Sequence, residues 1–262
     1  MYNNLCRLKK GAEIHDYTQF LGGGGARGYN PQRLKNIFAK AGFTLAEVLI
    51  TLGVIGVVAA ITMPALIQKY TNHVVETRLK SFYSQVNQAI MLSEAEYGDK
   101  KEWFGGKEVY DGEDKAVERD EWFQKYIGKH MKIVKKEIGL PAMVGWSSGG
   151  NLYYLANGSA FGFMQGTIRD WVFFPGNPYK CLNKNSNPTR SCMFWFNYCP
   201  ACKNEGWDYH YNKSVEPWKF QWDGTEEYLK THCAGYGGTF CAALIQYNGW
   251  SIPNDYPAKV SY

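Results

Sequence analysis

The chain has 262 residues, a length that suffices for one or two domains. Its formal net charge is +5, and it contains nine tryptophans and nineteen tyrosines. Residues 1–42 hold seven basic and two acidic residues, hence 7 − 2 = +5, while residues 43–262 hold 29 − 7 = 22 basic and 24 − 2 = 22 acidic residues. Because the basic excess lies entirely in the first 42 residues, the rest of the chain does not have the charge of a nucleic-acid-binding protein, and we expect no nucleic-acid partner.

A leader of 42 residues comes first, and its glycine-rich stretch LGGGGARG (21–28) lacks the Gly-Lys-Ser/Thr of a phosphate-binding loop, so it is interpreted as a linker. An apolar segment of membrane length follows. From Phe43 to Ile67 there are 25 residues, and Glu47 is their only charge. As a helix the segment spans roughly 37 Å, enough to cross the hydrocarbon core. Lys and Arg before such a segment are typical of a cytoplasmic flank.

Two familiar kinds of apolar segment do not fit well. A cleaved secretory signal has a shorter apolar core, followed by a small-residue cleavage site. A plain membrane anchor explains the length but not the acid, since a charge in hydrocarbon is costly.

The sequence GFTLAE (42–47), followed by the apolar segment, resembles the processing site of type IV prepilins and type II secretion pseudopilins. The resemblance covers about 30 residues, and it implies that a membrane peptidase cuts after Gly42 and that Phe43 becomes the N-methylated mature N-terminus. It also implies that Glu47 is the acid that this family carries four residues further on, and that the helix kinks or loosens at Pro64. Leaders in this family are usually shorter than 42 residues.

Glu47 needs a partner at the edge of the bilayer, because a lone carboxylate and a lone ammonium there each cost several kcal/mol. The α-amino group created at Phe43 is one turn away in the same helix, and in an assembly it is also within reach from a neighbouring subunit. The alternative is that Glu47 only snorkels at the membrane edge, where a negative charge also suits a helix N-terminus.

The resemblance further implies a set of partners and a location. The partners are other pilin or pseudopilin subunits, a prepilin peptidase/methyltransferase, an inner-membrane assembly platform and membrane lipid. The precursor is expected to cross the inner membrane once, with a cytoplasmic N-terminus and an exported head, before it enters a filament.

Beyond the membrane segment the helix is expected to continue, from about Thr44 to Tyr97, and to stop at Gly98-Asp99. Apolar residues in its outer half recur at steps of four and three, which predicts an amphipathic stripe. The stripe consists of Val75, Leu79, Phe82, Val86 and Ile90. The predicted organisation is a leader (1–42), a membrane and assembly helix (43–67), its amphipathic continuation (68–98) and an exported head (99–262).

The head is expected to be α+β, with a small antiparallel sheet. Residues 99–120 are predicted to form a loop, with a solvated turn rather than a calcium site at DGED (111–114), and residues 121–137 a helix. Two strands are predicted around Asn157-Gly158, a signal for a type I′ turn. The remaining predictions are strands at 170–176 and 191–198 and helices at 226–234, with Asp223 or Thr225 as N-cap, and at 238–249.

Six cysteines lie in residues 181–241, an even number that fits a disulfide framework in an exported head, and Cys6 leaves with the leader. Six cysteines allow fifteen connectivities. Three disulfides are favoured, with Cys233–Cys241 joining two helices and Cys181–Cys192 closing a polar loop. Cys199-Pro-Ala-Cys202 also has a redox and a zinc interpretation, but it has no thioredoxin-like unit and no paired CxxC spacing around it.

No catalytic motif accompanies the five scattered histidines, so we expect neither an enzyme nor a cofactor or metal site. The favoured function is a filament subunit, with the large, cysteine-rich head favouring a minor one. The alternative is a membrane-anchored exported binding protein, such as an adhesin or a DNA-uptake receptor, whose aromatic side chains stack on sugars or bases.

Overall fold

The structure is a computed structural model that describes residues 43–104, 114–141, 150–164, 167–184, 188–204 and 206–262. The leader, with Gly42 and Cys6, and residues 111–113 of the DGED turn lie outside the described residues. The chain divides into two units, Met1–Val54 and Ile55–Tyr262. The sheet and the buried residues of the long N-terminal helix, from Val75 to Ser93, all belong to the second unit.

Helix α1 (Leu45–Tyr97) confirms the long N-terminal helix and its end before Gly98. The five residues of the predicted amphipathic stripe are all fully buried, at 0% exposure each. Residues of α1 as far as Tyr70 are exposed or at most half-buried, so burial begins only where the stripe begins. The change of burial along the helix therefore follows the change of sequence from uniformly apolar to amphipathic.

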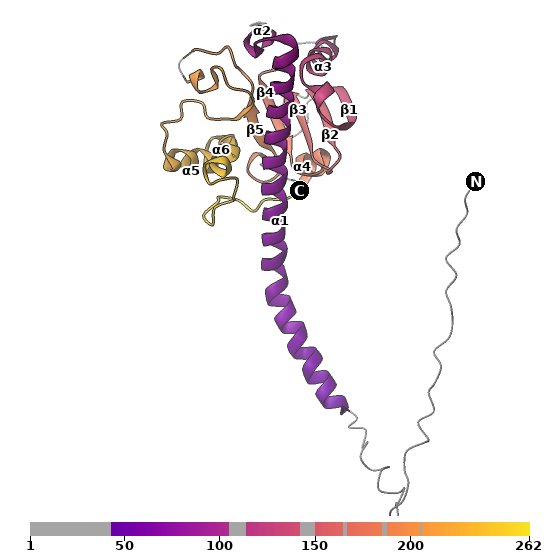
Figure 1. Cartoon of the computed structure of the whole chain (residues 1–262). Coiled ribbons are helices and arrows are strands. Elements are labelled where there is room, and N and C mark those ends of the chain that lie inside the picture. Colours follow the sequence, from indigo (N-terminus) through magenta and orange to yellow (C-terminus); the bar gives the residue numbers. More distant parts are fainter. Residues whose placement is uncertain (1–42, 105–113, 142–149, 165–166, 185–187, 205) are drawn as a thin grey trace, which may run out of the picture. The chain divides into compact units, whose positions relative to one another are not determined.

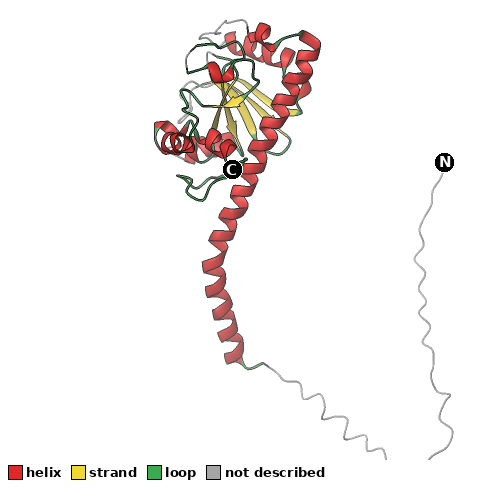
Figure 2. Cartoon of the chain, turned by 60° about the vertical axis from the view of Figure 1, so that its left-hand side comes forward, coloured by secondary structure: helices red, strands yellow, loops and turns green. Residues whose placement is uncertain are grey.

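The head contains one six-stranded antiparallel sheet in which each strand lies beside the next in the chain (Figure 2). This confirms the α+β class, the predicted hairpin and the two aromatic strands that follow it, although β6 was not predicted. The strands are β1 (Ile133–Leu140), β2 (Gly150–Leu155), β3 (Ala160–Met164), β4 (Asp170–Phe174), β5 (Phe194–Asn197) and β6 (Glu216–Pro217).

Helix α1 packs on one face of the sheet (Figure 1). On that face Phe82 meets the aromatic rings of three adjacent strands. Its ring centroid lies 5.2 Å from that of Phe161, 4.6 Å from Phe173 and 5.3 Å from Phe196. Alternate strand residues point to the other face, where they contact Leu182 and a disulfide. Both faces of the sheet are thus buried over β2 to β5, which explains why these strands are apolar at nearly every position.

Within the head, helices were predicted well only near the C-terminus. Helix α5 (Glu226–Ala234) begins at its predicted N-cap Thr225, whose hydroxyl oxygen accepts the N–H of Tyr228 at 3.2 Å. Helix α6 (Cys241–Tyr247) ends shortly before Gly249, as predicted. Helix α4 (Pro178–Lys184) was not predicted.

The predicted loop over residues 99–120 is wrong, because two helices, α2 (Lys100–Phe104) and α3 (Asp114–Tyr126), occupy part of it. In α2 the Trp103 side chain is only 6% exposed and donates its indole N–H to the carbonyl of Gly98 at 3.1 Å. Burying this one aromatic ring orders a stretch whose charge is typical of a loop.

The predicted helix over residues 121–137 is right only as far as Tyr126, where α3 ends, because residues 133–137 belong to strand β1. Lysine and glutamate favour a helix there, but pairing with β2 overrides this weak local preference. The carboxylate of Glu137 accepts hydrogen bonds from the hydroxyls of Tyr154, at 2.7 Å, and Tyr179, at 2.8 Å. These bonds hold the strand at the edge of the sheet.

The β2–β3 turn differs from the predicted type I′ turn. Gly158 has φ +81°, but Asn157 is not among the described residues with positive φ. The N–H of Gly158 donates to the carbonyl of Leu155 at 3.0 Å, and the N–H of Leu155 donates to the carbonyl of Ser159 at 2.9 Å. This pattern is that of a three-residue hairpin loop with glycine in the left-handed position.

Candidate functional site: the start of α1 and the head it carries

The predicted processing site lies at the start of α1. Phe43 precedes the helix and is 86% exposed. Glu47 Oε2 accepts hydrogen bonds from the Thr44 backbone N–H at 2.8 Å and the Thr44 hydroxyl at 2.9 Å. In return the Glu47 N–H donates to the Thr44 hydroxyl oxygen at 3.2 Å. Thr44 and Glu47 therefore form a capping box, an arrangement that satisfies backbone N–H groups at a helix start.

Sequence reasoning overlooked this role of Thr44, although the spacing Thr-x-x-Glu is the signature of a capping box. The Thr44 N–H belongs to the peptide bond after Phe43, so cleavage before Phe43 leaves the box intact. Among the described residues both donors from Thr44 end on Oε2 of Glu47, which leaves Oε1 accessible to a further donor.

The apolar segment after the capping box is not covered by any of the residues that the structure describes. Helix α1 is the one helix among the described residues that is long and apolar enough to cross a membrane, and none of that apolar stretch is buried. Pro64 lies inside α1, and the kink expected there stays a prediction. An exposed apolar helix together with three disulfides suggests a membrane-anchored, exported protein.

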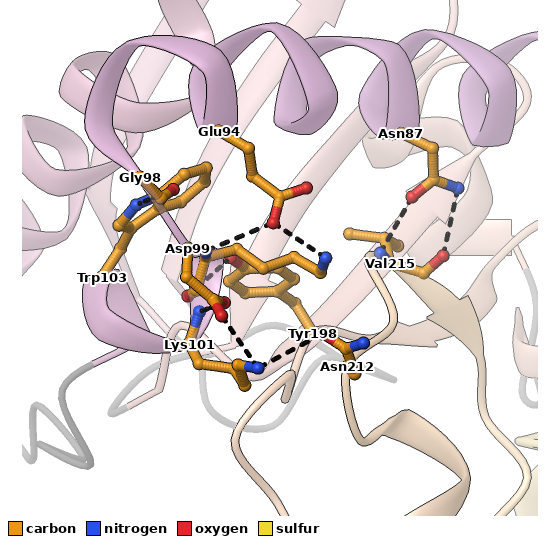
Figure 3. A network of polar contacts seen from close by, with 10 residues as sticks. Asn87, Glu94, Gly98, Asp99, Lys101, Trp103, Tyr198, Asn212 and Val215 are labelled. Carbon is orange, nitrogen blue, oxygen red and sulfur yellow. Dashed lines mark hydrogen bonds and ion pairs between the residues drawn. The ribbon is translucent and has the colours of Figure 1, made fainter.

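The far end of α1 holds a long segment of the head (Figure 3). The side-chain amide of Asn87 accepts the Val215 N–H at 2.9 Å and donates to the Val215 carbonyl at 3.2 Å. Glu94 Oε1 accepts the Lys100 ammonium at 2.9 Å, and the Tyr198 hydroxyl donates to the Lys100 carbonyl at 3.4 Å.

The turn after α1 adds a further link to the same segment. Lys101 Nζ lies 2.8 Å from a carboxylate oxygen of Asp99 and donates to Asn212 Oδ1 at 3.4 Å (Figure 3). Asn212 has φ +58°, in the left-handed region. Tyr198, Asn212 and Val215 are therefore each positioned by a polar contact with α1 or with α2, which follows it.

The six cysteines of the head form three disulfides, which confirms the disulfide framework. The pairs are Cys181–Cys192, Cys199–Cys202 and Cys233–Cys241. The four cysteines of the zinc interpretation are thus paired as two separate disulfides. The CxxC pair does not open a helix, as a thioredoxin-like redox pair does; it closes a turn in which the Cys202 N–H donates to the Cys199 carbonyl at 3.0 Å.

Replacing both cysteines of a pair by alanine is expected to lower the free energy of unfolding in the order of loop length. The separations are 11, 8 and 3 residues, for which loop-closure entropy gives losses from about 3 down to about 2 kcal/mol. Urea unfolding of the full chain measures this. Alkylation of the denatured chain without reductant is its control, since it should label Cys6 alone in the precursor and no cysteine in a chain cut after Gly42. Labelling at four head cysteines together with stoichiometric zinc would favour the metal interpretation instead.

His210 is a buried polar group that the sequence did not mark out. It is 0% exposed, and neither ring nitrogen has a hydrogen-bond partner among the described residues. Its ring lies 3.9 Å, between centroids, from that of Tyr209. Burial lowers the pKa of His210 from 6.5 to about 3, and the charges of Lys219, Lys213 and Arg169 add to this effect.

The head is therefore expected to lose stability in acid through His210. The unfolded chain protonates this ring below pH 6.5, while the folded chain keeps it neutral down to about pH 3. Between these values the unfolded state binds more protons, so the free energy of unfolding falls as the pH falls, by up to about 1.4 kcal/mol per pH unit. In His210→Phe the slope of the free energy of unfolding against pH should be smaller by up to about 1.4 kcal/mol per pH unit. Urea unfolding between pH 4 and 7 measures this slope.

His73→Gln is the matched control, because the His73 side chain is 77% exposed. It should keep the wild-type slope. An equal slope in wild type and His210→Phe would show that His210 does not stay neutral in the folded chain.

Comparison with known proteins adds one finding. Searches among curated proteins and among solved structures gave no match. One family model matches residues 65–260, which is more than half of the chain and includes all of the sheet. The chain thus belongs to DUF6613, a family of unknown function.

Proposed function

We propose that this protein is a structural subunit, of the minor kind, in a type IV pilus or a type II secretion-like pseudopilus. It is made as a prepilin, cut after Gly42 and N-methylated at Phe43. The observation that carries the proposal is the spacing of Gly42, Phe43 and Glu47 directly at the start of an exposed apolar helix.

The architecture supports the same proposal. One helix carries both an apolar stretch with nothing packed on it and a stripe buried against an antiparallel sheet. The apolar helices of several copies of such a chain are able to pack against one another, while each copy holds a folded, disulfide-bonded head outside the membrane. In this proposal the subunit passes through the inner membrane with its head exported, and its partners are other subunits, the peptidase/methyltransferase and the assembly platform.

N-terminal mass spectrometry of membrane and sheared-filament fractions tests the proposal. The sheared fraction should contain chains that begin at N-methyl-Phe43, and the membrane fraction both these and the precursor. A chain that stays uncut and never appears in the sheared fraction is a plain membrane-anchored protein, and the proposal is then wrong.

A further inference from the structure

Residues 206–222, which we call the aromatic loop, are unusually rich in aromatic side chains that remain in contact with solvent. None of these rings is fully buried. Aromatic side chains are large and usually dominate cores and interfaces, so a loop that leaves six of them partly open points to a recognition surface. They are Trp207, Tyr209, Tyr211, Trp218, Phe220 and Trp222.

The aromatic loop encloses a hollow of about 370 Å³ on the surface of the head. Such a volume lies within the usual range of small-molecule sites, roughly 300–1,000 Å³. Two aromatic rings, a carboxylate, an amide, an ammonium group and a glycine backbone surround it. The lining residues are Gly206, Asp208, Tyr209, Lys219, Gln221 and Trp222.

Each aromatic wall of this hollow is held in place by a hydrogen bond to the backbone. The Trp222 indole N–H donates to the Thr225 carbonyl at 2.8 Å. The Tyr209 hydroxyl oxygen accepts the Lys219 backbone N–H at 2.9 Å. Since each ring is fixed by a polar contact at its edge, the hollow is preorganised and does not depend on a ligand for its shape.

The side-chain amide on the rim of the hollow belongs to Gln221, whose backbone has an unusual conformation. Gln221 has φ +55°, which is uncommon and costly for a residue with a side chain, and its N–H donates to the Gly206 carbonyl at 3.2 Å. Gly206 has φ +82°, and a Cβ atom there would lie 2.8 Å from Gln221 Cγ and from the Phe220 ring. Glycine at 206 thus permits the close approach that places the exposed Gln221 side chain on the rim.

The charges around the hollow are balanced. Asp208 carries the negative charge of the rim and Lys219 the positive one, and the Lys219 ammonium also lies 3.5 Å from Glu216 and 5.5 Å from the centre of the Trp222 ring. A nucleic-acid strand needs a groove with basic excess, which this rim lacks. A purely apolar ligand would leave the Asp208 carboxylate and the Gln221 amide without partners in the hollow.

We propose that the hollow of the aromatic loop binds an uncharged sugar ring of a glycan. Asp208 and Gln221 present planar oxygen and nitrogen groups to neighbouring hydroxyls, and Tyr209 and Trp222 supply aromatic walls for the C–H surface of the ring. This binding activity of the head goes beyond the proposed filament role and does not depend on it.

The test uses the full chain in a detergent without a sugar headgroup, and calorimetric titration with maltohexaose, cellohexaose and chitohexaose. At least one of these uncharged oligosaccharides should bind saturably, and Asp208→Ala/Gln221→Gly should weaken that binding by roughly tenfold or more. Glycine at 221 is compatible with the positive φ, so this variant is expected to fold, which near-ultraviolet circular dichroism checks.

Lys180→Ala/Asn183→Ala is the matched control, because these two residues line a different hollow of the same head. It should bind the oligosaccharide like the wild type. The proposal is overturned if none of the three probes binds the wild type, if the Asp208/Gln221 variant binds as tightly as the wild type, or if oligothymidylate binds the hollow instead. N-terminal processing is measured independently, so failure of this test leaves the filament proposal standing.

Discussion

Gly42→Val is expected to stop maturation, so that the full precursor collects in the membrane and no chain beginning at N-methyl-Phe43 is found. Glycine has no Cβ and resists helix formation, so we expect the peptide bond before Phe43 to be accessible to a peptidase. Valine adds a β-branched side chain directly beside that bond. Intact-mass measurement of the membrane fraction distinguishes the precursor from the shortened chain.

Ala41→Val is the matched control, since it adds the same side chain one residue further from the scissile bond. It should be cut at a rate much closer to that of the wild type. The head is expected to fold in both variants, with all three disulfides formed, because the described contacts of the sheet involve residues far beyond the leader. Cleavage of Gly42→Val at the wild-type rate would contradict the proposed processing site.

The parts of the fold that were predictable from sequence have strong local patterns. The stripe from Val75 to Ile90 repeats at helical spacing over several turns, and every member of it is buried. Asn157-Gly158 between two apolar runs marked the hairpin correctly, although the turn type depends on backbone angles that the dipeptide alone does not determine. A regular spacing of apolar residues predicts secondary structure because it indicates which face of a helix or strand is buried.

Predictions failed where a tertiary contact overrides the local composition. Lys135 and Glu137 are residues that favour a helix, yet they lie in β1, which pairs with β2. The segment between the two strands includes residues 142–149, which lie outside the described part of the chain. The two-residue strand β6 is too short to leave a pattern, and it exists because Phe196 and Asn197 pair with it.

In the candidate site, too, features with a local sequence pattern differ from features that depend on tertiary packing. The roles of Phe43 and Glu47 rest on the fixed spacing of the motif and stay predictions, whereas the Thr44 cap could have been predicted from its spacing to Glu47. The burial of His210 and the hollow at Asp208 and Gln221 depend on how a loop without periodicity folds back on itself. No local signal in the sequence reports such long-range packing.

Glu47→Ala is expected to separate membrane insertion from assembly. The variant should reach the membrane at normal levels, be cut largely as usual and be lost from sheared filaments. Removing an acid from an apolar segment makes insertion easier. In the proposed filament, the same change removes the carboxylate that would neutralise the Phe43 α-amino group of a neighbouring subunit. Immunoblots of membrane and sheared fractions, with the N-terminus checked by mass spectrometry, measure the three steps separately.

The capping box gives Glu47 a second role, and two further variants distinguish it from the charge. Glu47→Gln keeps a side-chain oxygen that can accept from Thr44, so the cap survives while the charge is lost. Thr44→Ala keeps the charge and weakens the cap, at a cost of about 0.5–2 kcal/mol to the helix start. Because the charge is what the Phe43 amine requires, Glu47→Gln should be lost from filaments as completely as Glu47→Ala, whereas Thr44→Ala should assemble.

Other outcomes for these variants would assign a different role to Glu47. If Glu47→Gln assembles and both Glu47→Ala and Thr44→Ala do not, the cap is what assembly requires, and Glu47 acts by fixing where the helix starts. If Glu47→Ala enters filaments at the wild-type level, the assembly role is wrong. Glu47 then only snorkels at the membrane edge, where the positive end of the helix dipole and the two donors of Thr44 are sufficient to hold it.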